Sequence, residues 1–145
     1  MKKIFLLIFI FLHFHSVSLA KNLKLSKIAS LDKPWGSSFI SNDEIIITEK
    51  SGKIKIINTL NGNVAKIKHN LNFLEYGQGG LLDILYKDNF IYVSYTENRT
   101  NWKTSTSIAK AKLDRQNLLF KNIFQANPPI DSGYHFGSRL AIKDN

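Results

Sequence analysis

The chain has 145 residues and a formal net charge of +9 at neutral pH, and it contains no cysteine. This length allows one domain at most. Without cysteine there is no disulfide framework, no thiolate metal site and no thiol nucleophile. The basic residues are scattered singly, with no run of five or six like charges, so the positive charge does not indicate nucleic-acid binding.

The first twenty residues have the three-part pattern of a secretory signal peptide. Lys2 and Lys3 are followed by an apolar stretch over residues 4–14, and Ser18-Leu19-Ala20 places small residues where a signal peptidase reads. The stretch is shorter than the roughly 20 residues of a membrane-spanning helix. We therefore expect residues 1–20 to be removed, leaving a periplasmic or secreted protein that begins at Lys21 and has no membrane span. An uncleaved membrane anchor is the alternative.

The rest of the sequence predicts short strands separated by turns. Apolar and β-branched residues alternate with polar ones, and Asn, Asp, Gly and Ser cluster between these segments. No segment keeps the spacing of a long amphipathic helix. A first set of strands is expected at residues 35–40, 44–49, 53–58 and 63–67, and a second at 81–86, 90–96, 105–113 and 118–125. Two further strands are expected at residues 22–29 and 138–142.

Two sets of four antiparallel strands, each followed by a longer loop, are typical of consecutive β-propeller blades. A propeller needs at least four blades of roughly 40 to 50 residues each. Residues 21–145 would supply two blades and the start of a third, with the strand at residues 22–29 completing the last blade of the ring. The predicted fold is therefore an all-β, incomplete propeller. A sandwich or barrel of about nine strands is the alternative.

Two glycine-containing loops are the candidate functional segments. Gly77-Gln78-Gly79-Gly80 precedes the second set of strands, and residues 131–139 lead into the expected third set. In a propeller, both positions open onto the same end of the central channel. A neutral His135 imidazole could accept a proton there, and the Gln78 amide offers a donor and an acceptor. The alternative roles are a buried His135 held by a neighbour and a Gln78 that bonds to the loop backbone.

The sequence also predicts the surroundings of five other side chains. His69 is expected to be solvated in a polar turn. Asp83 is expected to be either a structural hydrogen-bond acceptor or a pocket residue. Trp35 and Phe39 are expected in the core, and Arg139 is expected to pair within its own blade.

Five short motifs occur in a fixed order along the chain. They are Leu31-x-x-Pro34-Trp35-Gly36, Thr48-Glu49-Lys50-x-Gly52, Gly77-Gln78-Gly79-Gly80-Leu81-Leu82-Asp83, Tyr92-Val93-Ser94-Tyr95 and Gly133-x-His135-Phe136-Gly137-Ser138-Arg139-Leu140. From about Leu31 to the end of the chain, their series and spacing resemble the soluble PQQ-dependent aldose sugar dehydrogenases, the glucose/sorbosone dehydrogenase family. Ser138 departs from this pattern where the family commonly has glycine, and so does Lys50 where arginine is usual.

The resemblance implies an exported six-bladed propeller that binds pyrroloquinoline quinone (PQQ) and Ca²⁺ at one end of its channel and oxidises the anomeric hydroxyl of aldose sugars. By this resemblance His135 would be the general base, taking the hydroxyl proton while hydride moves from the sugar carbon to the quinone. Gln78 would lie beside the base and the cofactor. The electron acceptor that reoxidises the cofactor is not indicated.

The resemblance also limits what this segment can do. The family's calcium ligands, and the basic residues that hold the quinone carboxylates, are expected in later blades, so no metal ligand is assigned within these residues. The segment alone is expected to be an inactive N-terminal part of the enzyme. A non-catalytic secreted propeller that binds a ligand, and an inactive truncated remnant, are the alternatives.

Overall fold

The computed structural model describes residues 24–143, so the predicted signal peptide lies outside the described residues. Their regular structure is nine strands and one short 3-10 helix, which agrees with the expected all-β class. The elements are β1 (Pro34–Phe39), β2 (Glu44–Glu49), β3 (Lys53–Asn58), β4 (Val64–His69), β5 (Leu81–Lys87), β6 (Phe90–Asn98), η1 (Thr100–Trp102), β7 (Thr104–Lys112), β8 (Asn117–Leu118) and β9 (Lys121–Gln125).

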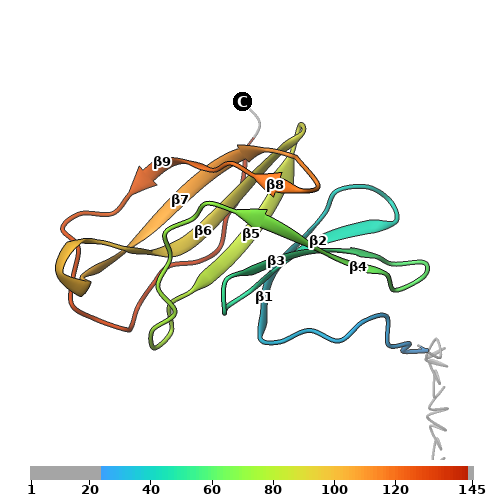
Figure 1. The fold of residues 1–145 in the computed structure, drawn as a ribbon, viewed down its shortest axis with the longest axis horizontal. Coiled ribbons are helices and arrows are strands. Elements are labelled where there is room, and N and C mark those ends of the chain that lie inside the picture. Colours follow the sequence, from blue (N-terminus) through green and yellow to red (C-terminus); the bar gives the residue numbers. More distant parts are fainter. Residues whose placement is uncertain (1–23, 144–145) are drawn as a thin grey trace, which may run out of the picture.

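The strands form two sheets, which Figure 1 shows beside one another as successive parts of the chain. The first sheet has the order β1-β2-β3-β4-β8 and the second has the order β5-β6-β7-β9. Neighbouring strands are antiparallel except for β4 and β8, which are parallel. Strands β1 to β4 of the first sheet, and β5, β6, β7 and β9 of the second, thus each form a set of four antiparallel neighbours, as expected of a propeller blade.

Three of the expected strands differ from the structure. Described residues 24–29 and 138–142 form no strand, because no neighbouring strand within residues 24–143 lies beside them to complete a ladder. The strand expected at residues 118–125 is divided between the two sheets, since β8 pairs with β4 while β9 pairs with β7. Buried Leu118 and Phe120 anchor the crossing segment, and the side chain of Asn70 binds the backbone N–H and carbonyl of Phe120.

The main hydrophobic core lies between the two sheets. Side chains alternate along a strand, so each sheet turns one apolar face toward the other. The first sheet contributes Ile46, Ile54, Ile56 and Ile67, and the second contributes Ile91, Val93, Tyr95, Ala109 and Ala111, among others. Burying each large aliphatic side chain stabilises the fold by roughly 1.5–3 kcal/mol.

Trp35 and Phe39 do not belong to this core, contrary to the sequence-based expectation. Their side chains are 43% and 61% exposed. Phe39 instead lines a shallow apolar cleft on the outer face of the first sheet, together with Ile45, Ile47 and Ile57. Strand alternation explains the exposure of Phe39, because a residue on the outer face of β1 cannot reach the space between the two sheets. Trp35 lies where the register of β1 is irregular, and its Nε1 donates to Ser138 Oγ at 3.4 Å.

The two sheets meet most closely where β1 crosses β5. A Cβ atom added to Gly36 would lie 2.7 Å from the Cα of Asp83 and 2.7 Å from the backbone nitrogen of Ile84. Only glycine permits such an approach of two backbones. The fully buried Thr48 completes the contact, because its Oγ1 accepts the N–H of Gly36 at 3.0 Å and donates to the carbonyl of Leu82 at 2.5 Å.

The second sheet repeats this arrangement toward the segment that follows it. The Oγ of buried Ser94 accepts the backbone N–H of Asp83 at 3.0 Å and donates to the carbonyl of Ser138 at 2.5 Å. In both places, a hydroxyl on the second strand of a sheet links its own first strand to the segment that follows. Although residues 138–142 form no strand, they therefore occupy the place of the first strand of a third blade.

Glu49 forms a buried ionic centre at the end of β2. Its side chain is fully buried and accepts hydrogen bonds from Lys55 Nζ at 2.6 Å and from the N–H of Asp32 at 2.8 Å, and Lys53 Nζ lies 3.6 Å away. Burial raises the pKa of Glu49, but the bonds to Lys55 and Asp32 and the positive charges of the two lysines outweigh it, so the pKa lies below its ordinary value of 4.5.

The depressed pKa of Glu49 predicts a loss of stability in acid. The ionised carboxylate contributes fully above about pH 4.5, and this contribution is lost as pH falls through the lower folded-state pKa. Glu49→Gln should cost about 1.5–3 kcal/mol of unfolding free energy at pH 7 and should flatten the fall in stability below pH 4.5. Urea unfolding of the complete protein between pH 3 and 7 measures both effects. A variant whose stability follows the same pH curve as wild type would contradict this role.

Candidate functional site

The candidate site is formed by the two glycine-containing loops predicted from the sequence, which lie against each other. The backbone N–H of Gln78 donates to the carbonyl of Gly133 at 2.7 Å. In return, the amide oxygen of Gln78 accepts the backbone N–H of His135 at 3.0 Å. Gln78 and His135 are 57 positions apart in the sequence, and the fold brings them into direct contact.

Close backbone packing makes this contact possible. Gly77 has φ of +56°, and a Cβ atom added to it would lie 2.3 Å from the carbonyl oxygen of Gly133. A side chain at Gly77 would therefore force the two loops apart in addition to straining the backbone. The glycine in front of Gln78 sets the distance between the loops.

Lys50 holds the Gln78 loop from the side of the first sheet. Its Nζ donates a hydrogen bond to the carbonyl of Gly77, and its own carbonyl accepts the N–H of Leu81 at 3.2 Å. The segment between Gly77 and Leu81 is thus fixed at both ends by one residue. Lys50 belongs to a motif noted in the sequence, but its residue type alone did not predict this role.

Within residues 24–143 His135 is exposed, and its side chain is not in the buried arrangement that was the alternative expectation. Its φ of +65° lies in the left-handed region, which is uncommon for residues other than glycine, and such conformations often occur at functional sites. The rings of His135 and Tyr134 are 6.3 Å apart between centroids. The imidazole is therefore accessible to a ligand, while the His135 backbone is fixed by Gln78.

Gln78 is also exposed and does bond to backbone, as one of the two sequence-based alternatives proposed. The bond to His135 uses only the oxygen of the amide. An amide NH₂ group remains a strong hydrogen-bond donor, so Gln78 can position His135 and bind a ligand at the same time.

Asp83 and Arg139 anchor the segment that follows His135. Buried Asp83 accepts the N–H of Leu140 at 2.8 Å through Oδ2, and Arg139 Nη1 lies 3.2 Å from Oδ1. Of the two roles expected for Asp83, the structure shows the structural hydrogen-bond acceptor. Arg139 was expected to pair within its own blade; in the described residues it pairs instead with Asp83 on β5.

His69 does not belong to the site. The prediction that its side chain is solvated is wrong. It is half-buried at the end of β4, where Nε2 lies 2.8 Å from the carbonyl of Gly52 and Nδ1 accepts the N–H of Leu71 at 3.3 Å. Both ring nitrogens are used within the protein, so His69 has a structural role.

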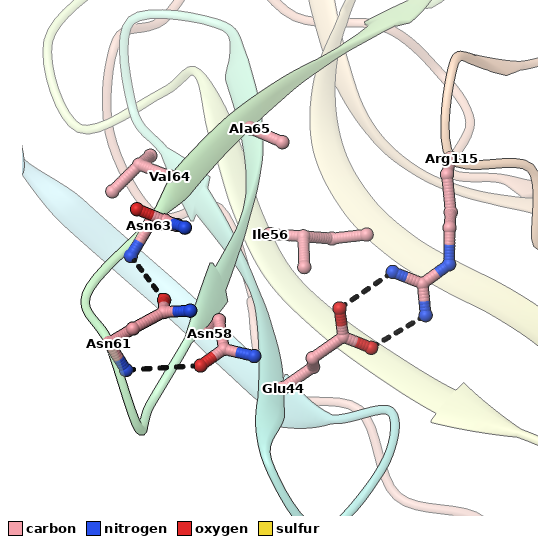
Figure 2. A pocket seen from close by; sticks show the side chains of 8 residues that line it. All are labelled: Glu44, Ile56, Asn58, Asn61, Asn63, Val64, Ala65 and Arg115. Atoms are coloured by element: carbon pink, nitrogen blue, oxygen red, sulfur yellow. Dashed lines mark hydrogen bonds and ion pairs between the residues drawn. The ribbon is translucent and has the colours of Figure 1, made fainter.

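A different cleft, shown in Figure 2, lies near the start of β2, at the other end of that strand from Lys50. Arg115 makes two hydrogen bonds to Glu44, at 2.7 and 2.6 Å, and these hold the pKa of Glu44 below its ordinary value. The side-chain oxygens of Asn58 and Asn61 accept backbone N–H groups of their own turn. Arg115, Asn58 and Asn61 therefore use their polar groups to support turns of the chain.

Within residues 24–143, no group of three His, Asp or Glu side chains is placed to hold a metal ion. No helix in this part of the chain is long and apolar enough to cross a membrane.

Comparison with known proteins agrees with the geometry. A model of the glucose/sorbosone dehydrogenase family matches residues 31–145. The aldose sugar dehydrogenase YliI of Escherichia coli is 30% identical over 121 residues, which are 77% of this chain and 33% of YliI. This chain spans about a third of the length of the curated relatives that it matches.

Solved structures show the same fold. The apo form of the soluble aldose sugar dehydrogenase of Escherichia coli superposes with a TM-score of 0.71 at 27% identity, covering 77% of this chain and 35% of that one. The PQQ-bound aldose sugar dehydrogenase of Streptomyces coelicolor has a TM-score of 0.63 at 19% identity, covering 72% and 34%. These two sheets are thus part of a β-propeller, and the chain belongs to the glucose/sorbosone dehydrogenase family.

Proposed function

We propose that the complete protein is a PQQ-dependent aldose sugar dehydrogenase and that this chain supplies its general base, His135. The observation that carries the proposal is the direct contact between the Gln78 amide oxygen and the backbone N–H of His135, whose side chain is exposed. The similarity to aldose sugar dehydrogenases supports the substrate class. A non-catalytic propeller would not need this pair at one end of its channel.

The proposed reaction converts the anomeric C–OH of an aldose into the C=O of a lactone. Neutral His135 takes the hydroxyl proton as the C–H bond breaks, because this keeps positive charge off the sugar. Bound PQQ would supply the acceptor for the two electrons and the hydrogen of that C–H bond. Gln78 keeps the backbone of His135 in place and donates a hydrogen bond from its amide NH₂ to an oxygen of the ligand.

One feature of the described residues supports the proposal of a PQQ site. A Cβ atom added to Gly137 would meet no atom of the described residues within 4 Å, so open space lies two positions after His135. A planar quinone could approach the backbone there. The proposed Ca²⁺ ligands, and the basic groups that would pair with the quinone carboxylates, belong to the later blades of the complete protein.

Substitution of His135 tests its role as the base. In the complete protein with PQQ and Ca²⁺, His135→Ala should lower kcat for aldose oxidation by two or more orders of magnitude. The midpoint of thermal unfolding should change little, because the side chain is exposed. Dye-linked kinetics and calorimetry measure the two effects.

His69→Ala is the matched control, since it removes a histidine with structural bonds. It should lower the unfolding temperature while the turnover of the folded protein stays near wild type. An unchanged rate in His135→Ala would remove His135 as the base.

We also propose that the protein is exported to the periplasm or the medium, on the basis of the signal-peptide pattern at residues 1–20. N-terminal sequencing of the protein expressed in a Gram-negative host should find Lys21 as the first residue, in the periplasmic or extracellular fraction. Recovery of the intact Met1 terminus in the cytoplasm or in the membrane would contradict export as a cleaved protein.

A further inference from the structure

Thr96, on β6, lies beneath the loop that carries Gln78 and contacts it at three points. Its backbone N–H donates to the carbonyl of Gly80 at 2.9 Å, and its carbonyl accepts the N–H of Leu74 at 2.9 Å. A Cβ atom added to Gly79 would lie 2.6 Å from Thr96 Oγ1 and 3.0 Å from both Cβ and Cγ2 of Thr96. The backbone of Gly79, the residue directly after Gln78, therefore rests on the side chain of Thr96.

The hydroxyl of Thr96 is not explained by hydrogen bonding within the described residues. The side chain is fully buried, and Oγ1 has no hydrogen-bond partner within residues 24–143. A buried hydroxyl without a partner destabilises a fold, so native proteins keep few of them. In the described part of the chain, Thr96 thus acts on the Gln78 loop through its backbone and through the shape of its branched side chain.

Thr96 occupies in the second sheet the place that Lys50 occupies in the first. Each lies two positions after the linking hydroxyl of its sheet, which belongs to Thr48 in the first sheet and to Ser94 in the second. Each also donates its backbone N–H to the carbonyl of the residue directly before the first strand of its sheet, at 3.0 Å for Lys50 and 2.9 Å for Thr96. Lys50 thus holds the Gln78 loop from the first sheet, and Thr96 holds it from the second.

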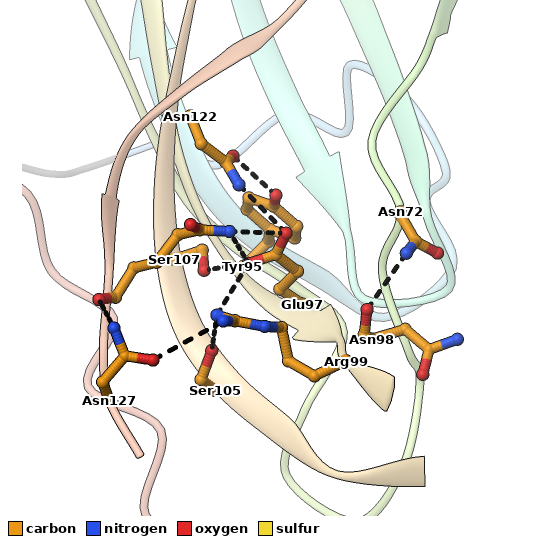
Figure 3. Close-up of polar contacts among 10 residues, drawn as sticks. Asn72, Tyr95, Glu97, Asn98, Arg99, Ser105, Ser107, Asn122 and Asn127 are labelled. Atoms are coloured by element: carbon orange, nitrogen blue, oxygen red, sulfur yellow. Dashed lines mark hydrogen bonds and ion pairs between the residues drawn. The ribbon is translucent and has the colours of Figure 1, made fainter. Parts of the chain in front are cut away.

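Figure 3 shows the polar contacts that hold this end of β6. Side chains alternate along a strand, so those of Tyr95 and Glu97 lie on the opposite face of β6 from that of Thr96. Glu97 accepts hydrogen bonds from Ser107 at 2.6 Å and from the side chain of Asn122 at 3.0 Å. The amide oxygen of Asn122 also accepts the hydroxyl of Tyr95 at 2.7 Å. Both neighbours of Thr96 are therefore fixed to β7 and β9, which gives the Gln78 loop a rigid support.

We propose that Thr96 is a positioning residue for the Gln78–His135 pair and acts through Gly79. The amide oxygen of Gln78 accepts the His135 N–H at 3.0 Å, so a small shift of the loop lengthens or breaks this bond. The loop thus transmits the position of Thr96 to the backbone of His135. The effect on turnover rests on the proposed function, whereas the effect on the bond between Gln78 and His135 does not depend on it.

Amide hydrogen exchange of His135 measures this bond directly. In the complete protein labelled with ¹⁵N-histidine, Thr96→Ala removes the support below Gly79 and should speed exchange of the His135 N–H about tenfold, because local opening becomes easier. Thr96→Val keeps both branches of the side chain and should leave the rate near that of wild type. An unchanged rate in Thr96→Ala would overturn the proposal.

A compensating pair of substitutions separates positioning from a general loss of stability. Gly79→Ala pushes a methyl group against Thr96 without backbone strain, because φ of Gly79 is not in the left-handed region, and it should also speed exchange about tenfold. When Thr96→Ala is added, that methyl group takes the space of Oγ1 and Cγ2. The double variant should therefore exchange about threefold more slowly than Gly79→Ala alone. Effects that simply add would contradict action through this contact.

Val93→Ala is the matched control, since Val93 is fully buried on β6 and packs in the core on the other face of the strand from Thr96. It should lower the unfolding temperature and leave the exchange rate of the His135 N–H near wild type. If Val93→Ala speeds exchange by the same factor as Thr96→Ala, any loss of stability loosens the site and the positioning role is wrong.

Steady-state kinetics connect the position of the loop to the proposed reaction. With PQQ and Ca²⁺ bound to the complete protein, Thr96→Ala should lower kcat for glucose oxidation about tenfold, because a displaced base costs large factors in rate. Thr96→Val should stay near wild type. If exchange responds as predicted but the wild-type protein oxidises no aldose, the proposed function fails and the positioning role stands. An active wild-type enzyme with the same kcat as Thr96→Ala would overturn the inference.

Discussion

The structure depends on a hydroxyl group that links each sheet to the segment that follows it. Thr48 and Ser94 occupy equivalent places on β2 and β6, and each accepts an N–H from its own first strand and donates to a carbonyl of the next segment. Each hydroxyl is buried, so leaving the backbone groups without it would cost about 1–3 kcal/mol. The repetition sets the spacing of successive blades near the channel.

This spacing brings the candidate site together from separate parts of the chain. The bond from Ser94 to the carbonyl of Ser138 and the bonds from Asp83 to Leu140 and Arg139 fix the segment directly after His135. On the other side, Lys50 fixes the loop that carries Gln78. The exposed pair thus stands on rigid supports in two sheets, which suits catalysis because small displacements of a base cost large factors in rate.

Much of the fold follows from local pattern, and the remainder depends on distant partners. The strand limits of β2 and β3 were predicted to the residue, since alternation and turn chemistry are local properties. The pairing of Leu118 with the first sheet, and the exposure of Phe39, depend on which sheet each segment meets, and neither leaves a local signal.

The candidate site shows the same division. The two predicted loops lie against each other in the structure, because the glycine motifs and the order of the blades indicate that they meet. The roles of Lys50 and His69 were missed, since a lysine Nζ on a carbonyl and a histidine between two backbone groups have no sequence signature. The exposed indole of Trp102 was likewise not predicted, because its left-handed backbone is visible only in the structure.

The most direct test of this account is aldose oxidation by the complete protein, measured with PQQ, Ca²⁺ and a redox dye for wild type, Ser94→Ala and Ser94→Thr. Ser94 lies on β6, and its hydroxyl binds the N–H of Asp83 and the carbonyl of Ser138, so it acts by fixing the backbone on both sides of this link. The account predicts PQQ-dependent oxidation by wild type, a loss of about tenfold or more in kcat for Ser94→Ala, and a smaller loss for Ser94→Thr, which keeps the hydroxyl. Wild-type turnover in Ser94→Ala, or no aldose oxidation by the wild-type protein, would contradict it.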